Sequence, residues 1–598
     1  MKVRTGLVVA VCAVFLVGSQ ASGQTWVLMY YMCNGEGQYS DLERACEVKF
    51  TAVAESAGNT NFVAYLLWDH VDGEDRIFKM KNETDWINGY THNVDYWTPA
   101  DLGLADPELA TGDPNTLNAF VDFVVAREPN DCHYLLVVFN HGGGIHPTKD
   151  MEDYGLTGIG FDADPNGYLS VKGLGQSCAH LASQIGRKFE VLNLDACLMQ
   201  MIEISHEVRN SCEYVVACEN EGWWVTPSWE GGYLDQITGD PDEPNALSMA
   251  IAVAGAYADE MDDPLGIDPN ILDPNIFDPN IFNYKGYTIS VVDQAQTEAV
   301  SNAVDALAVT LVNNVHLHTV RNGIEAARSE TQKMAYFDSF YTATQSNVFL
   351  DLKDLCEEIN NHVTSMPEIN DAATAVIDAI GDVGAGLVSW ELHQTGLGPF
   401  YISFTELKIG IYNFELGTHG VSIFFPESTL EPDRMTYRNY LNESGTPSDL
   451  AFCADTHWDE FLRKYIESRS LALLLAGDAL GTVTVETESG SFVVDTSDPN
   501  HPYYMFPIDT AVTLTAEEYP NHPGSFRYWL IYNLQDANDG NYPIEDGNLV
   551  ISLLMDRDQM VVPVFECGDN CGSGVAPLMP MMLGMLGLAA LARAKYRG

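Results

Sequence analysis

The sequence predicts an α/β protein in which a mostly parallel sheet is sandwiched by helices and is followed by a small all-β module. Two observations carry this prediction. Short apolar runs alternate with helical segments between residues 26 and 218. From residue 471 onward, apolar and polar residues alternate strictly instead, which is typical of strands with one buried face.

The elements of the predicted sheet follow from these runs. Continuous apolar stretches are typical of parallel strands that are buried on both faces. They predict strands at 26–32, 62–68, 134–139, 189–194 and 214–218, with helices around 42–48, 117–125 and 171–185. In such sheets the chemistry lies at the carboxyl ends of the strands. A segment at 267–282 repeats Asp-Pro-Asn-Ile every five residues, which excludes a regular helix and predicts a surface insertion. Calcium binding by its carboxylates is the alternative interpretation.

Composition limits the class of partner. The chain has 598 residues, of which 46% are apolar, enough for sizeable cores and against wholesale disorder. Its 85 acidic and 29 basic residues give a net charge of −56. A field of that sign repels phosphates and excludes nucleic acid as a natural partner, whereas it attracts cationic substrates.

Both ends of the chain predict export. Residues 1–23 combine Lys2 and Arg4, an apolar run and a small-residue cleavage motif, which together indicate a signal peptide rather than an uncleaved anchor. Residues 567–598 combine a glycine-rich hinge, an apolar run and a basic end. This tail resembles bacterial C-terminal sorting signals; a plain membrane anchor is the alternative. Either interpretation places the body outside the cytoplasm, held at the cell surface or outer membrane or released from it.

The predicted domains are the signal peptide at 1–23, an α/β domain at 24–470, the β-rich module at 471–566 and the tail at 567–598. The module's strands are expected at 481–486, 511–516, 549–554 and 560–565, with Phe526 and Trp529 as an aromatic pair. It resembles internalin B-repeat modules, which implies spacing or adhesion rather than catalysis.

Cysteines contribute one further constraint. Eleven remain after removal of the signal peptide, and this odd number leaves at least one thiol unpaired. No repeated pair has zinc spacing, so no metal site is expected.

Two predicted strands end in reactive residues. The strand at 134–139 runs into Asn140-His141-Gly142-Gly143-Gly144, and the strand at 189–194 runs into Asp195-Ala196-Cys197. A histidine beside a cysteine can take the thiol proton and later donate it to a leaving group. The backbone N–H groups of Gly142 and Cys197 are candidates for an oxyanion hole. The pair therefore predicts a thiol nucleophile with its acid/base.

These boxes resemble those of the clostripain family of cysteine peptidases, relatives of caspases, gingipains and legumain. The start at 25–30 and the segments at 420–426 and 458–464 also fit that family, so the resemblance covers residues 25–466. It implies a caspase-like sheet with His141 as acid/base and Cys197 as nucleophile. No cofactor is required by it, although calcium activates some members, which raises Ca²⁺ as an activator here.

The resemblance also implies a substrate class. Members cut after Arg or Lys. Their P1 pocket binds the substrate side chain that precedes the cut, and an acidic residue lies at its base. Asp195 corresponds to that residue. Glu219 and Glu221 are candidates for a second acidic wall. The alternative role for Asp195 is to cap the following helix. Lys149, in the segment after His141, is the candidate site of self-cleavage.

The sequence thus favours an exported, surface-anchored cysteine endopeptidase that cleaves protein or peptide substrates after Arg or Lys, with its membrane contact through the tail. The alternative is a surface adhesin that keeps the peptidase fold without activity. The presence of both His141 and Cys197 favours the enzyme.

Overall fold

The structure is a computed structural model of the chain. It describes residues 25–33, 41–56, 62–70, 75–80, 95–128, 131–145, 158–163, 166–220, 230–237, 245–261, 286–334, 348–403, 406–414, 417–426, 440, 450–466, 468–473, 481–487, 490–494, 503–507, 511–518, 526–533, 544–555 and 559–565. The predicted signal peptide, the Asp-Pro-Asn repeat, Lys149, Glu221 and the C-terminal tail lie outside the described residues.

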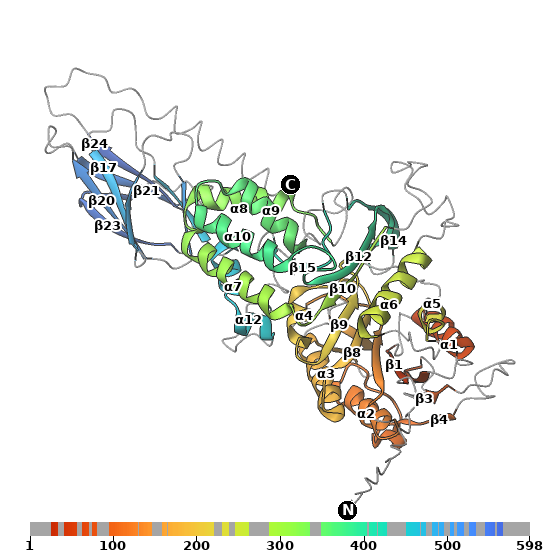
Figure 1. The fold of residues 1–598 in the computed structure, drawn as a ribbon. Coiled ribbons are helices and arrows are strands. Elements are labelled where there is room, and N and C mark those ends of the chain that lie inside the picture. Colours follow the sequence, from red (N-terminus) through yellow and green to blue (C-terminus); the bar gives the residue numbers. More distant parts are fainter. Residues whose placement is uncertain are drawn as a thin grey trace, which may run out of the picture.

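A central sheet organises the larger part of the described chain (Figure 1). Five adjacent strands run parallel, and the strands at both edges are antiparallel, which matches the mostly parallel sheet expected. In spatial order the strands are β12 (Val388–Gln394), β10 (Tyr287–Asp293), β9 (Cys212–Ala217), β8 (Phe189–Asp195), β5 (His133–Phe139), β1 (Trp26–Met32), β2 (Phe62–Trp68), β3 (Arg76–Lys79) and β4 (Asp95–Trp97).

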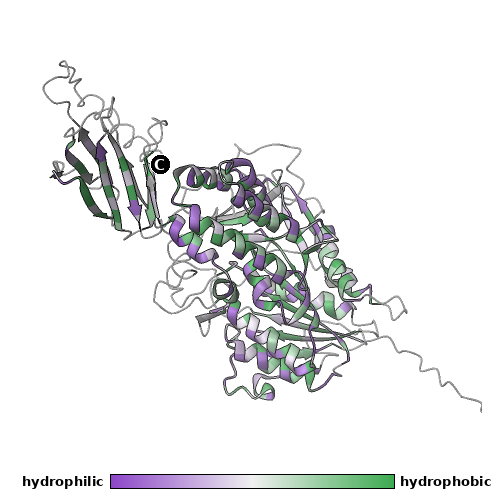
Figure 2. Ribbon diagram, turned by 60° about the vertical axis from the view of Figure 1, so that its left-hand side comes forward, coloured by the Kyte–Doolittle hydropathy of each residue, from purple (hydrophilic) through white to green (hydrophobic). Residues whose placement is uncertain are grey.

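Helices cover both faces of this sheet, and each layer encloses its own core (Figures 1 and 2). One face is packed by α1 (Asp41–Ser56), α5 (Glu230–Leu234) and α6 (Ala246–Met261). The helices of the other core are α2 (Pro114–Val125), α3 (Val171–Ile185), α4 (Ile202–Val208), α7 (Thr297–Asn314), α8 (His318–Glu330), α9 (Leu352–His362), α10 (Pro367–Ile380), α12 (Ala451–Asp455) and α13 (Trp458–Ile466). We call these the α1 face and the α9 face.

Local sequence explains where these elements begin and end. The β1 strand is buried along its whole length, as its unbroken apolar run predicts. The α3 helix begins after Ser170, whose side chain accepts a hydrogen bond from the Gly173 N–H, and ends at Gly186, where φ is 75°. The α2 helix begins with Pro114 behind the capping side chain of Asp113. These signals place the sheet's connections, and hence the strand ends that carry the site.

Short strand pairs lie outside the central sheet. A one-turn 3₁₀ helix, η1 (Pro99–Leu102), follows β4. The pairs are β6 (Ile159–Ala163) with β7 (Asn166–Leu169), β11 (Phe349–Asp351) with β15 (Ser422–Phe424), and β13 (Gly396–Ser403) with β14 (Glu406–Tyr412). The first pair lies next to the glycines that follow His141, because Ile159 bridges Gly142.

The β-rich module has a separate core formed by two sheets. One sheet contains β19 (Tyr503–Pro507), β16 (Ser468–Leu473), β24 (Gln559–Phe565), β21 (Phe526–Asn533) and β22 (Ile544–Asp546). The other contains β18 (Gly490–Val493), β17 (Gly481–Thr487), β20 (Ala511–Glu518) and β23 (Val550–Leu554). Because β16 pairs with β19 and β24, it belongs to the module, which therefore starts at Ser468 rather than at residue 471.

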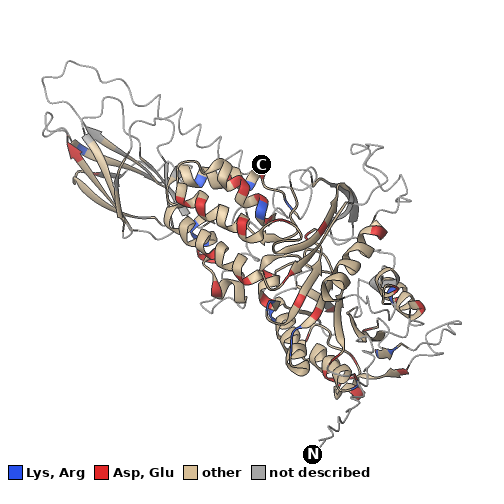
Figure 3. Cartoon of the chain, viewed as in Figure 1, with Lys and Arg blue, Asp and Glu red and all other residues tan. Residues whose placement is uncertain are grey.

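Acidic residues outnumber basic ones along the described chain, as the composition indicates. Figure 3 shows Asp and Glu spread over the helices and loops of the sheet domain, with few Lys and Arg among them. In the part of the chain that the structure describes, no helix is both long and apolar enough to cross a membrane.

Candidate active site

The His141 and Cys197 segments follow neighbouring parallel strands. The β5 and β8 strands pair in register up to their last residues, with Phe139 opposite Asp195. The Asn140 N–H then donates to the Asp195 carbonyl at 3.4 Å. Both segments therefore leave the sheet at its carboxyl edge, side by side.

Gly142 shows how closely the two segments approach each other. A Cβ atom built on Gly142 would lie 2.2 Å from the Cys197 carbonyl oxygen and 2.9 Å from the Cys197 nitrogen. No side chain fits at that separation, so the backbone of the His141 box rests directly on the backbone of the nucleophile candidate. The Gly143 N–H donates to the Gly158 carbonyl at 2.9 Å. This hydrogen bond uses the Gly143 N–H and not the Gly142 N–H.

Asn140 holds the start of the histidine box. Its side chain is 4% exposed, and its Nδ2 donates to the Cys33 carbonyl at the end of β1. Its Oδ1 accepts from the His141 N–H. This connection fixes the His141 backbone against the neighbouring strand. Asn140 is present in the box that the sequence singled out, but the role of its side chain depends on a carbonyl 107 residues away.

Cys197 differs from the other cysteines of the described chain. Nine cysteines are described and none forms a disulfide; eight are buried, and Cys197 is the partly exposed one. Burial raises the pKa of several of the others, Cys132 to about 11. Leu198, directly after Cys197, has φ of 61°, the single positive φ outside glycine among the described residues. Its N–H donates to the Asn220 carbonyl at 3.0 Å. The turn that presents Cys197 is thus held in a conformation that a leucine rarely adopts.

Asp195 faces the α1 face of the sheet. Its Oδ2 lies 2.7 Å from Lys49 Nζ on α1 and accepts a hydrogen bond from the Tyr30 hydroxyl at 3.1 Å. The Lys49 side chain is fully buried and that of Asp195 is 10% exposed. Lys49 Nζ also lies 4.8 Å from the centre of the Phe139 ring. Asp195 does not cap α4, which begins at Ile202 behind Met201, so the capping alternative is wrong.

Glu219 lies on the opposite, α9 face of the sheet. Burial raises the pKa of its carboxyl group well above the usual range, with further contributions from Asp351 and Glu391. Asp351 caps α9 and also contacts His419, with 3.1 Å between carboxylate and ring nitrogen. The structure therefore does not bring Glu219 and Asp195 together as two walls of one pocket. Side-chain alternation from the strand ends sends them to different layers.

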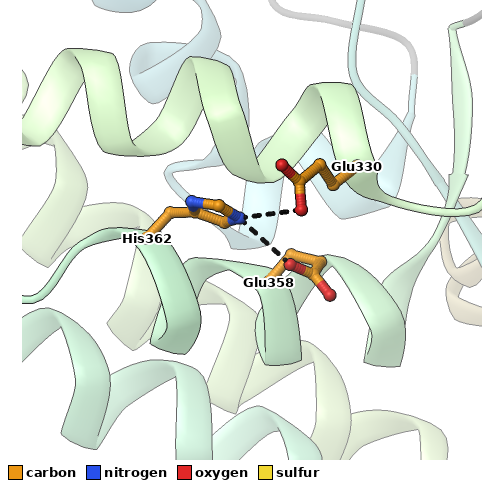
Figure 4. Close-up of side chains that lie close together, drawn as sticks. All are labelled: Glu330, Glu358 and His362. Atoms are coloured by element: carbon orange, nitrogen blue, oxygen red, sulfur yellow. Dashed lines mark ion pairs between the residues drawn. The ribbon is translucent and has the colours of Figure 1, made fainter.

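Two groups of side chains in the described chain have the spacing of metal ligands. Figure 4 shows the first, where His362 Nε2 lies 3.2 Å from Glu330 Oε2 and 3.3 Å from Glu358 Oε2. These contacts are ion pairs between helix-surface residues. The second group, Asp69, Asp75 and Glu108, follows β2 and precedes α2, away from Cys197 in the sequence.

Comparison with protein families decides the class. The model of the clostripain family matches residues 51–467, well over half of the chain. This chain belongs to the clostripain family. The match contains both the His141 and Cys197 boxes and ends one residue before β16, where the separate β-rich module begins.

The solved structures compared with this clostripain-family peptidase include two C11 proteases of low sequence identity. No curated protein matches it. A secreted C11 cysteine protease from Bacteroides thetaiotaomicron, in complex with an irreversible peptide inhibitor, is 15% identical, with a TM-score of 0.49. An inactive zymogen C11 protease from Parabacteroides distasonis is 16% identical, with a TM-score of 0.47. Each comparison covers 73% of this chain and 99% of the other.

The clostripain-family peptidase has features that its sequence did not reveal. Lys49 lies in a helix where a lysine normally faces solvent, and nothing local indicates that it pairs with Asp195. The positive φ of Leu198 has no sequence signal either, because a leucine is an unusual choice for that conformation.

Proposed function

We propose that this peptidase is an exported endopeptidase in which Cys197 is the nucleophile and His141 the acid/base. The observation that carries the proposal is the packing of Gly142 onto the Cys197 backbone, since it sets the two boxes against each other. The partial exposure of Cys197 supports it, because a nucleophile must reach its substrate while the eight buried thiols cannot.

The proposed reaction proceeds through an acyl-enzyme. The Cys197 thiol gives its proton to His141, and the sulfur attacks the scissile carbonyl carbon. The carbonyl oxygen becomes an oxyanion, which the N–H groups of Gly142 and Cys197 stabilise. His141 donates the proton to the leaving amine as the C–N bond breaks, giving a thioester. Water then loses a proton to His141 as its oxygen attacks the thioester carbon. The C–S bond breaks, the acid leaves, and His141 returns the proton to the Cys197 sulfur.

We assign the preference for Arg or Lys at P1 to Asp195. It lies two residues before Cys197, and its carboxylate attracts a guanidinium or ammonium group. Lys49 and Tyr30 both contact Oδ2, so these two side chains hold the partly exposed carboxylate in place. The nearby Lys49 charge lowers the pocket's attraction for a second cation. We expect the selectivity for basic residues to be smaller than an unpaired carboxylate would give.

The remaining parts of the proposal concern residues outside the described chain. Residues 1–23 direct export, and residues 567–598 anchor the protein at the cell surface. Self-cleavage occurs at Lys149. If the purified wild type stays a single chain and is fully active on peptides, Lys149 is not a self-cleavage site.

The test uses fluorogenic peptides with Arg, Lys, Asp or Leu at P1. Wild type should cleave after Arg and Lys under reducing conditions, and Cys197→Ala should abolish cleavage. Cys132→Ala is the matched control, because this buried cysteine precedes β5 at the end of the strand far from His141. Asp195→Asn should lower the ratio of kcat/KM for Arg over Leu peptides. That ratio does not depend on the folded fraction. A preference for Asp or Leu at P1 would contradict the role proposed for Asp195 in substrate selectivity. It would leave the proposed role of Cys197 as nucleophile unchanged.

A further inference from the structure

An imidazole and two carboxylates converge between helices α8 and α9, outside the candidate active site (Figure 4). Glu330 is the last residue of α8. Glu358 and His362 lie four residues apart on α9, which places them on the same face of that helix. The ligand atoms of the three side chains all lie within 4.8 Å of one another. The group therefore combines the residue types and the spacing of a metal site.

The two helices that carry these side chains are packed closely together. A Cβ atom built on Gly323 of α8 would lie 2.8 Å from the His362 carbonyl oxygen. The Gln332 N–H, just after α8, donates to Asp354 Oδ2 on α9 at 2.6 Å. Ile359, between the two α9 ligands, is fully buried in the core. The backbone thus holds the three side chains in a fixed relation before any ion binds.

The distances within the group are those of a coordination shell. His362 Nε2 lies 3.2 Å from Glu330 Oε2 and 3.3 Å from Glu358 Oε2, so one ring nitrogen faces two carboxylates. By contrast, His180 Nε2 lies 2.7 Å from Asp122 Oδ1, as in a simple hydrogen-bonded ion pair. Ligand atoms placed tetrahedrally about 2.0–2.1 Å from a zinc ion lie roughly 3.3 Å apart. Both separations at His362 match an edge of that tetrahedron.

We propose that Glu330, Glu358 and His362 bind one zinc ion, with water as the fourth ligand. Zinc takes imidazole nitrogen and carboxylate oxygen together, whereas calcium requires about six to eight oxygen ligands. The charge of the two carboxylates balances that of the ion when the imidazole is neutral, as a metal-bound histidine must be. The Glu330 side chain is 63% exposed, so the fourth position is open to solvent.

Bound zinc would join the end of α8 to α9. Glu330 lies at the negative end of the α8 dipole, where a carboxylate alone is unfavourable and a cation is favourable. The α8 helix also contacts β19 of the β-rich module. Zinc should therefore stabilise the part of the peptidase unit that meets the module. The proposal does not depend on the assignment of the catalytic dyad.

The experiment measures zinc binding in the full chain carrying Cys197→Ala, because an accessible thiol would itself bind zinc. The protein is stripped with EDTA and titrated with ZnCl₂ in competition with a chromophoric chelator, and its Tm is followed over the same concentrations. One saturable equivalent and a rise in Tm are expected. His362→Ala should weaken this binding by at least about tenfold, since loss of an outer-shell partner alone commonly costs that much. It should also remove the rise in Tm.

His180→Ala is the matched control, because it removes another helix-surface histidine, paired with a single carboxylate, and should keep the equivalent. Glu330→Gln is the second ligand variant, and its exposed position makes misfolding a small concern. It should weaken binding as His362→Ala does. Equal zinc affinity in the Cys197→Ala parent, His362→Ala and Glu330→Gln would overturn the proposal, as would the absence of a saturable equivalent in the parent. A Tm response to CaCl₂ as large as that to ZnCl₂ would overturn the assignment to zinc.

Discussion

At the scale of single residues, the geometry of the site depends on a position that has no room for a side chain and on a buried positive charge. Gly142 is the clearest case, because it must lack a side chain for the His141 box to lie on Cys197. Lys49 is the second, because it is a fully buried cation beside the carboxylate to which we assign substrate selectivity. Both act on the site through contacts between segments that are far apart in the sequence.

Gly142→Ala should lower kcat/KM by at least about 100-fold, because the new Cβ would push the oxyanion donors and Cys197 apart. The fold should persist, as circular dichroism and Tm would show. Gly255→Ala on α6 is the matched control, since a Cβ added at Gly255 would meet no atom within 4 Å. Full activity in Gly142→Ala would contradict the close packing.

Lys49→Met should destabilise the protein by about 3 kcal/mol, because it removes the buried ammonium group that lies 2.7 Å from the Asp195 carboxylate. Asp195→Asn should destabilise the protein by a similar amount, because it removes the carboxylate charge beside the buried Lys49 ammonium group. Urea unfolding of both single variants and of Lys49→Met/Asp195→Asn completes a double-mutant cycle. The double variant should lose less than the two single variants combined. Additive losses would mean that the pair is not coupled.

At the scale of elements, α4 connects the Cys197 segment to the α9 face. Glu203 on this helix is fully buried, and its Oε1 accepts from the Phe424 N–H at 2.9 Å and the Tyr440 hydroxyl at 3.3 Å. Burial raises its pKa from 4.5 to about 7. These hydrogen bonds favour the charged form but do not offset the desolvation.

Glu203 should therefore make stability depend on pH. Between pH 4.5 and about 7 the native state binds more protons here than the unfolded state, so stability falls as pH rises across that window. The shift corresponds to roughly 3 kcal/mol. Glu203→Gln should remove this fall, so its Tm relative to wild type should rise from pH 5 to pH 8. Glu207→Gln, further along α4, is the comparison: burial also raises the pKa of this carboxyl group, which is only partly buried, so its variant should show a smaller change of the same sign. A pH-independent difference in Tm for Glu203→Gln would contradict the buried carboxyl.

At the scale of the whole molecule, the described chain contains a peptidase unit with two cores and a β-rich module with a third. Contacts between them are made by α13 and α8 with β16 and β19. The Arg321 guanidinium on α8 donates to the Tyr465 carbonyl, at the end of the peptidase unit itself. The module thus packs against the end of the peptidase unit that contains α8 (Figure 1).

A chain of residues 24–466 should keep kcat/KM on peptides within about twofold of residues 24–566, because the module shares no core with the site. Its Tm should fall modestly, through loss of the α13 and α8 contacts. The comparison needs both proteins purified under reducing conditions. Loss of activity with retained circular dichroism would show that the module acts on the site.

The sequence alone predicted the fold class and most of the elements around the site. Strands β1 and β2 have the expected bounds, as does helix α3, and β5, β8 and β9 differ by one or two residues. Long apolar runs and local caps determine these elements, so tertiary context changes them little. The antiparallel strands β3, β4, β10 and β12 were not predicted. The local pattern is weak for β3 and β4, which have four and three residues, and for β12, which is mostly polar.

The sequence by itself also determined the family and the two boxes that carry the proposed dyad, because each box is contiguous and follows a recognisable strand. Only the tertiary structure decided which charges meet. It placed Lys49 on Asp195, separated Asp195 from Glu219 across the sheet, and brought Asp69, Asp75 and Glu108 together. Charge pairing depends on the distances between segments that are far apart in the chain. Burial determines the strength of the electrostatic interaction of each charge. Neither quantity is encoded in a local pattern of residues.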